Sequence, residues 1–124
     1  MLILIEPNSD TPLYVQLRNQ VIKALVSGEL KEGDTLPSVR QMAQDLGVNL
    51  HTVNKAYKVL EDEGYLRIFG RRGAVIGALP AYTSENLAQL QEQIKHLFTE
   101  AQSHGIDETL FRELIDQTLK EKDN

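Results

Sequence analysis

Residues 36–66 read LPSVRQMAQDLGVNLHTVNKAYKVLEDEGYL, and this stretch decides the fold. Ser38, with Gln41 three residues later, matches a capping box, which is a common start of a helix. The apolar residues that follow fall on one helical face, and they are Val39, Met42, Ala43 and Leu46. Gly47 is free to adopt a positive φ, which permits a sharp turn. The stretch therefore predicts a helix that begins near Val39 and ends at Gly47.

A second helix is predicted directly after this turn. Asn49 can cap its start, and Gly64 can end it. Its apolar face, at spacings i, i+3, i+4 and i+7, consists of Val53, Ala56, Tyr57 and Leu60. The opposite face carries amide, imidazole and ammonium groups from His51, Asn54, Lys55 and Lys58. A polar helix face taken alone is more often merely solvated, so its role depends on the neighbouring elements.

A hairpin with a basic tip is predicted after the second helix. Apolar residues at 65–69 and 74–76 flank the sequence GRRG at 70–73, and this pattern is typical of two short strands joined by a turn. The glycines let the backbone approach a partner closely, and Arg71 and Arg72 indicate that the partner is anionic. We interpret the hairpin as a wing.

The residues before this stretch predict one more helix. Thr11 followed by Pro12 is a helix start, and Gly28 supplies the stop. Between them, apolar residues recur at spacings of three and four, at Tyr14, Leu17, Val21 and Leu25. Residues 29–37 are expected to form a loop, and the short apolar run at 1–5 is expected to form a strand.

The order helix, helix, glycine turn, helix and hairpin is that of a winged helix-turn-helix, so we expect a mainly α domain with a small β wing over residues 1–78. In such domains the helix after the turn lies in the major groove of double-stranded DNA, and the wing contacts the flanking backbone. Asn54 can make two hydrogen bonds to adenine, and His51 and Thr52 can contact base edges or phosphate. Basic residues on the same elements can offset phosphate charge, namely Arg40, Lys55, Lys58, Arg67, Arg71 and Arg72.

The charge of the chain is distributed unevenly. The net charge is -5, but residues 1–78 hold nine basic and nine acidic residues, whereas residues 79–124 hold four and nine. The whole acidic excess therefore lies in the second part. An acidic total does not exclude a DNA partner for the neutral first part, and it indicates that the two parts have different roles.

Two further helices are predicted within residues 79–124. Thr83 or Ser84 begins the first, Gly105 breaks it, and Asp107 can cap the second. These helices have more apolar side chains than a lone pair can bury, so either the winged domain or a two-fold partner covers them. We favour a homodimer because two half-sites on DNA require two DNA-binding domains. The expected dimerisation residues are Leu87, Leu90, Ile94, Leu97, Phe98, Phe111, Leu114 and Ile115.

The sequence offers no candidate catalytic residues. Cysteine is absent, the three histidines are scattered, and residues 70–73 precede a strand rather than the helix that a phosphate-binding loop requires. We therefore expect no enzyme activity, no cofactor and no metal site. The apolar run at the start is too short to span a membrane, and the expected location is the cytoplasm. The alternative that stays open is a winged-helix module that binds protein without binding DNA.

Several segments resemble the GntR-type regulators of bacteria. These segments are LPSVRQMA at 36–43, LGVN at 46–49, TVNKAY at 52–57 and LEDEGY at 60–65, and residues 12–14 and 27–34 resemble the family's first helix and loop. The resemblance implies that Ser38 and Arg40 contact the DNA backbone or bases. It also implies that residues 49–55, beginning with Asn49, contact the major groove, and that the wing tip with Gly70 and Gly73 enters the minor groove. Many members have arginine at the positions of Leu50 and Asn54, which leaves the base preference open.

The second part resembles one branch of that family. Residues 79–124 are too few for the ligand-binding domains of other branches, and two helices of this length are similar to the YtrA-like branch. The resemblance implies dimerisation through this part, and we expect a homodimer that binds a two-fold symmetric operator and acts as a repressor. Activation stays open as the alternative, as do the operator sequence, the regulated genes and the existence of a small-molecule effector.

Overall fold

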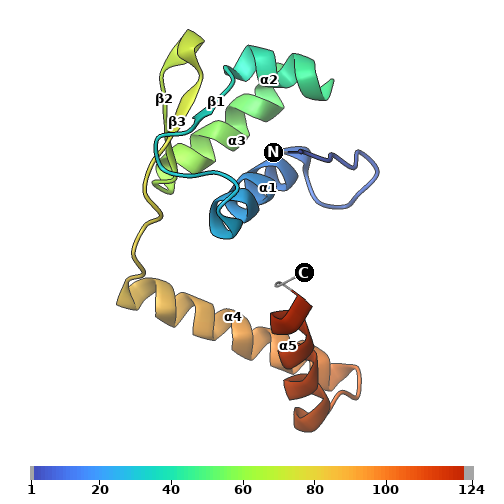
Figure 1. Cartoon of the computed structure of the whole chain (residues 1–124). Helices are drawn as coiled ribbons and strands as arrows, with labels where there is room; N and C mark the ends of the chain where they lie inside the picture. The colour runs from blue at the N-terminus through green and yellow to red at the C-terminus, as the bar shows by residue number, and fades with distance from the viewer. Residues whose placement is uncertain (1, 122–124) are drawn as a thin grey trace. The chain divides into compact units, whose positions relative to one another are not determined.

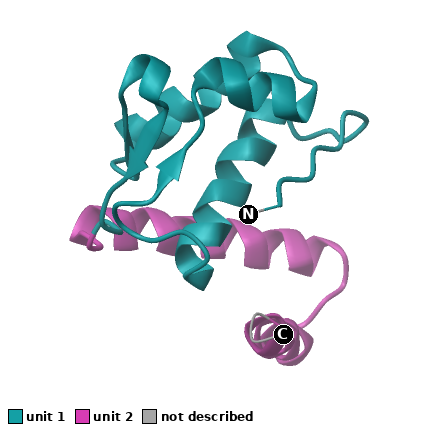
Figure 2. Ribbon diagram, turned by 45° about the horizontal axis from the view of Figure 1, so that its top comes forward, with its two compact units in different colours: residues 1–80 teal, residues 81–124 magenta. Residues whose placement is uncertain are grey.

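The computed structural model describes residues 2–121. In chain order they form α1 (Leu13–Ser27), β1 (Thr35–Leu36), α2 (Val39–Leu46), α3 (Leu50–Asp62), β2 (Leu66–Ile68), the 3-10 helix η1 (Gly70–Arg72), β3 (Ala74–Ile76), α4 (Ser84–Ser103) and α5 (Glu108–Glu121) (Figure 1). The chain divides into two compact units, residues 1–80 and 81–124, which Figure 2 shows in separate colours. The predicted mainly α fold with a small β wing and two C-terminal helices is confirmed.

The first unit has a continuous apolar core between α1, α2, α3 and the sheet. The predicted apolar faces of the three helices supply most of it, and its most deeply buried side chains are Leu17, Val21, Val53, Tyr57, Leu60 and Ile76. The hydroxyl of Tyr57 donates a hydrogen bond to the Pro37 carbonyl oxygen at 2.8 Å, which satisfies its polar end, and burial raises the pKa of this phenol. The core therefore joins α3 to the segment that leads into α2.

The wing belongs to a three-stranded antiparallel sheet of order β1-β3-β2. The expectation of a loop over residues 29–37 is wrong at its end, because Thr35 pairs with Val75 and Leu36 pairs with Ala74. A strand of two residues has no periodicity by which a sequence could indicate it. Gly73 has φ +87, and a Cβ there would lie 2.0 Å from the Leu36 carbonyl oxygen. The sheet itself therefore requires glycine at this position.

Side chains cap most of the helices as predicted. Ser38 Oγ accepts a hydrogen bond from the Gln41 backbone N–H, and Asn49 Oδ1 accepts one from the His51 N–H. The capping box is only half formed, because the Gln41 side chain donates to Asp45 Oδ1 instead. The predicted cap at Thr11 is wrong. Helix α1 begins after Pro12 without a side-chain cap, which is common at a first-turn proline.

The N-terminal segment is extended but is not a strand over residues 2–5, contrary to prediction, and Met1 lies outside the described residues. Two glutamine side chains of α1 take the place of a neighbouring strand. Gln20 Oε1 accepts from the Leu4 N–H at 2.7 Å, while its Nε2 donates to the Leu4 carbonyl. Gln16 bonds both backbone groups of Glu6 in the same way, at 2.8 and 3.0 Å. The backbone is thus satisfied without any sheet partner.

The second unit consists of α4 and α5. Thr83 caps α4 through the Asn86 N–H, and Asp107 Oδ1 accepts from the Leu110 N–H in the first turn of α5. Phe98 and Phe111 connect the helices, with ring centroids 5.0 Å apart. Among the described residues of this unit, Ala101 is the one apolar side chain that is buried. Phe98 and Phe111 are half-buried, and the leucine and isoleucine side chains of α4 and α5 are exposed.

Candidate nucleic-acid interface

The start of α2, the start of α3 and the wing tip surround a hollow of about 670 Å³. Six of the predicted DNA-binding residues line it, and they are Ser38, Arg40, His51, Asn54, Gly70 and Arg71. The three elements come together because Tyr57 holds the segment before α2 against α3, while β1 pairs with the wing strand β3. The fold therefore gathers residues that lie up to 33 positions apart, from Ser38 to Arg71.

The exposed face of α3 has two flanks. Because a helix advances about 100° per residue, Leu50 and Asn54 share one side, and Thr52 and Lys55 share the other. Leu50 and Asn54 line the hollow beside the wing. Lys55 lies instead against α1, where its Nζ is 4.1 Å from the centroid of the Tyr14 ring. His51 and Lys58 lie between the two flanks and are exposed.

The fold separates the charges that are mixed along the sequence. Within residues 2–121, the cations Arg40, Lys58, Arg71 and Arg72 take part in no ion pair. Two acids of the same unit, Glu61 and Glu63, are engaged in other contacts.

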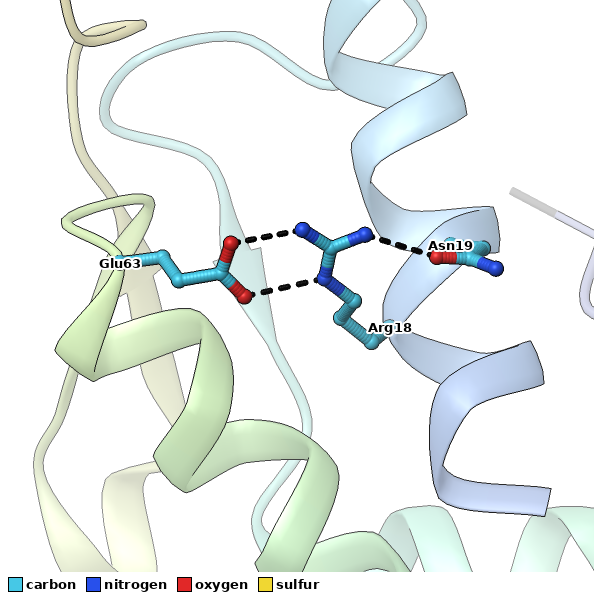
Figure 3. A network of polar contacts seen from close by, with 3 residues as sticks. All are labelled: Arg18, Asn19 and Glu63. Atoms are coloured by element: carbon cyan, nitrogen blue, oxygen red, sulfur yellow. Dashed lines mark hydrogen bonds and ion pairs between the residues drawn. The ribbon is translucent and has the colours of Figure 1, made fainter. Parts of the chain in front are cut away.

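Glu63 receives two hydrogen bonds from Arg18, at 2.6 and 3.0 Å, and Arg18 also donates to Asn19 at 2.8 Å (Figure 3). The hydrogen bond from Arg18 to Glu63 raises the pKa of the guanidinium. Glu61 Oε2 accepts from the Ile68 N–H at 2.8 Å at the base of the wing. The positive groups around the hollow therefore lack internal counter-charges in the described part of the chain.

The remaining predicted contacts are placed outside the hollow. Asn49 is engaged as the α3 cap, and Gly73 is buried against β1. Arg67 is exposed on β2 between the inward-facing Leu66 and Ile68, and its guanidinium lies 5.6 Å from the Phe69 ring centroid. Four further predicted residues do not line the hollow, namely Thr52, Lys55, Lys58 and Arg72.

Two apolar residues of the hollow were not predicted as site residues, namely Val39 and Ile68, whereas Leu50 belongs to residues 49–55, for which the family resemblance implies contact with the major groove. Leu50 is 38% exposed at the first position of α3. An apolar side chain in this place can contact the methyl group of thymine, which is one of the features displayed in the major groove. No signal in the sequence distinguished Val39 and Ile68 from core residues, because both belong to the apolar patterns of their elements.

Neither a metal-binding group nor a membrane-spanning helix is found among the described residues. Over residues 2–121, no group of three or more histidine or acidic side chains is arranged to hold a metal ion. None of the helices over the same residues is long and apolar enough to cross a membrane.

A glycine turn between two helices, a polar face on the second helix and a basic wing define a winged helix-turn-helix DNA-binding domain. Residues 13–76 match the family described as bacterial regulatory proteins, gntR family. The chain belongs to this family, and it is a DNA-binding transcription regulator.

Similar proteins extend the likeness into the second unit. The chain is 37% identical to the HTH-type transcriptional repressor YtrA of Bacillus subtilis (strain 168), over 86% of this chain and 83% of the relative. It is similar to YtrA from Sulfolobus acidocaldarius, a GntR-family transcription factor, at 38% identity and TM-score 0.62, covering 78% of this chain and 99% of that one. A structure named as a transcriptional antiterminator from Listeria monocytogenes EGD-e has TM-score 0.88 at 25% identity, covering 98% and 92%.

Proposed function

We propose that this chain represses transcription by binding a two-fold symmetric operator as a homodimer. Residues 1–78 of each protomer place α3 in a major groove, and residues 79–124 join the protomers. The observation that carries the proposal is the set of cations around the hollow that have no internal counter-charge among the described residues. A surface of this kind is suited to the phosphates that border a groove. Because the partner is the DNA of a bacterium, the proposed location is the cytoplasm.

The contacts divide into positioning and base recognition. Arg71 and Arg72 at the wing tip and Lys58 on α3 are suited to phosphates, which position a protein on DNA without reading its sequence. Asn54 and His51 project from the first half of α3 and are suited to base edges in the major groove. Arg40 lies at the start of α2, where its guanidinium group can bind a phosphate or a guanine.

The second unit supports the homodimer. Leu87, Leu90, Ile94 and Leu97 recur at alternating spacings of three and four along α4, and each is 47–58% exposed. This is the spacing of a helix that packs along another helix. Leu114 and Ile115 of α5 are also exposed, at 43% and 41%. Burying a fully exposed leucine or isoleucine side chain contributes about 1.5–3 kcal/mol, so covering these half-exposed side chains with a second copy contributes part of this for each.

Phe98 and Phe111 have a proposed role that differs from that of the exposed apolar residues. They pack on each other within one protomer, so we assign them to the support of the dimer surface rather than to its centre. An apolar groove of about 420 Å³ lies between α4 and α5 and is lined by residues that include Leu97, Leu114 and Ile115. Since these belong to the surface assigned to the partner copy, we propose no small-molecule effector there.

The test is selection of bound sequences from random DNA by the intact chain, followed by sedimentation of the protein alone. We expect a motif repeated with two-fold symmetry, a dimer in solution, and binding that weakens steeply with salt. Repression is then tested by transcription from a promoter that overlaps the selected site. A winged module that binds protein only would select no sequence and would show no salt-dependent affinity for DNA.

A further inference from the structure

Tyr14 and Lys55 form a contact that the helix-turn-helix arrangement alone does not explain. Tyr14 lies in the first turn of α1, outside the predicted DNA-binding elements. The ammonium group of Lys55 lies 4.1 Å from the centroid of its ring, a cation–π geometry. Lys55 takes part in no ion pair among the described residues, and the Tyr14 hydroxyl makes no hydrogen bond there. The pair is therefore held by the ring face and the charge.

The contact fixes Lys55 on one flank of α3. Asn54 and Leu50 face the hollow beside the wing, whereas Lys55 lies on the opposite flank, against α1. A helix in the major groove lies between two sugar-phosphate backbones, because the groove is about 12 Å wide. A wing on one flank contacts one backbone, and a cation on the other flank faces the second.

We propose that Tyr14 is a positioning residue for DNA binding, whose ring holds the Lys55 ammonium group toward the backbone opposite the wing. This inference rests on the proposed function. The physical reason is the flexibility of lysine, whose side chain loses part of its rotamer entropy when it binds. A ring that already confines the ammonium group reduces this loss, and the lysine keeps its charge for the phosphate.

The experiment uses the intact chain and the operator selected from random DNA, with affinities measured at fixed salt for a mutant cycle. We expect Tyr14→Leu to weaken binding about two- to fivefold, the range for a cation–π contact at an exposed site. Tyr14→Phe retains the ring face and should bind like the natural chain. Lys55→Met should reduce the salt slope by about one. In the Lys55→Met background, Tyr14→Leu should have no further effect.

A purely structural role for Tyr14 predicts different results, since the residue also packs against the core. In that case Tyr14→Leu would weaken binding equally with and without Lys55, and this outcome overturns the inference. A Tyr14→Phe variant that binds as poorly as Tyr14→Leu also overturns it, because the hydroxyl would then be responsible. Thermal unfolding of each variant shows whether its fold is intact.

If the Tyr14→Leu variant does not fold, a second measurement on the natural chain tests the inference. In the natural chain, the ring should shift the proton resonances of the Lys55 ε-methylene upfield, and these protons should stay close to the ring when operator DNA is added. Loss of the contact on DNA binding overturns the inference. Failure of the proposed function is recognised separately, because the natural chain would then select no operator at all.

Discussion

The two units of this chain leave different kinds of surface without a partner. The first unit buries a continuous core, with Leu17, Val53, Tyr57 and Leu60 at 0–1% exposure, and the cations that line its hollow have no ion pair among the described residues. The second unit leaves apolar stripes uncovered and carries the whole acidic excess of the chain. The first unit is therefore complete as a fold and leaves cations for an anionic partner, whereas the exposed apolar stripes of the second unit fit the second copy proposed above.

The physical origin of this difference is the number of elements that converge. In the first unit, three helices and a sheet present apolar faces to one another, so each face is covered. In the second unit, two helices meet along one line, and the stripe of each faces water over much of its width. Exposed apolar patches of this kind usually mark an interface.

Truncation after Pro80 tests the comparison most directly and has the largest expected effect. The remaining unit should stay folded and monomeric. It should bind a full operator about 10² to 10⁴-fold more weakly, because a dimer presents its second DNA-binding domain at high effective concentration. Affinity for a half-site should not fall, because the removed residues carry a net charge of -5 that repels phosphate. Sedimentation and binding to half and full sites provide the measurement.

A point variant keeps the acidic tail and isolates the apolar stripe. Leu97→Asp should give a monomer with weak binding to the full operator and natural affinity for the half-site. Thr99→Asp is the matched control and should remain a dimer, because position 99 is exposed and lies on the opposite side of the same helix from Leu97. The comparison between the units fails if the intact chain sediments as a monomer at micromolar concentration, or if truncation leaves full-site affinity unchanged.

Arg40→Ala should have the next largest effect, confined to the function of the first unit. Loss of a guanine contact costs about 1–3 kcal/mol and relaxes the preference at one base pair, whereas loss of a phosphate contact weakens binding to all sequences alike. Folding should be unaffected, because Arg40 is exposed and has no ion pair among the described residues. Lys23→Ala on α1 removes the same charge away from the hollow. Equal affinities for the two variants would remove Arg40 from the interface.

Features that repeat at a helical period could be predicted from the sequence. The helices, the αL turn at Gly47 and the caps at Ser38 and Asn49 were expected, because each depends on residue types at fixed local spacing. Features that depend on contacts between residues distant in the sequence could not be predicted from it. Strand β1 exists because Leu36 lies opposite Ala74, and the N-terminal segment is held by the side chains of α1 rather than by a strand.

The same distinction applies to the candidate site. His51 and Asn54 were predicted because they stand opposite the apolar face of their own helix. The contact of Lys55 with Tyr14 joins residues 41 positions apart, and no local pattern indicates it. Gly73 was attributed to a close approach of DNA, but in the structure the close approach at this residue is to the backbone of β1.

Replacing both Arg71 and Arg72 by alanine should weaken binding with little change in base preference. Each lost phosphate contact should reduce the salt slope by about one, so the double variant should flatten it by about two. The double variant Lys23→Ala with Lys31→Ala removes the same charge from α1 and the loop that follows. If the salt slope persists in the Arg71 and Arg72 variant, the wing tip does not meet DNA.

The smallest expected effect concerns the ion pair between Arg18 and Glu63, which joins α1 to the end of α3 (Figure 3). Its side chains are 31% and 35% exposed, so water and salt screen the attraction. Glu63→Gln should therefore lower the free energy of unfolding by only about 0.2–1 kcal/mol, and less at high salt. Asp62→Asn removes the same charge from the neighbouring position, where no ion pair is formed within the described residues.

Together, Glu63→Gln and Asp62→Asn distinguish the effect of a lost negative charge from the effect of a lost ion pair. Both should strengthen DNA binding slightly and equally, because each removes one negative charge from the unit that meets phosphate. Only Glu63→Gln should lower stability, because only Glu63 accepts the two hydrogen bonds from Arg18. Urea unfolding at low and high salt measures the stability, and titration with operator DNA measures the affinity. If Glu63→Gln weakens DNA binding while Asp62→Asn does not, the ion pair between Arg18 and Glu63 positions α3 for DNA. The packing of the first unit and its charged surface would then depend on each other, contrary to the comparison drawn between the two units.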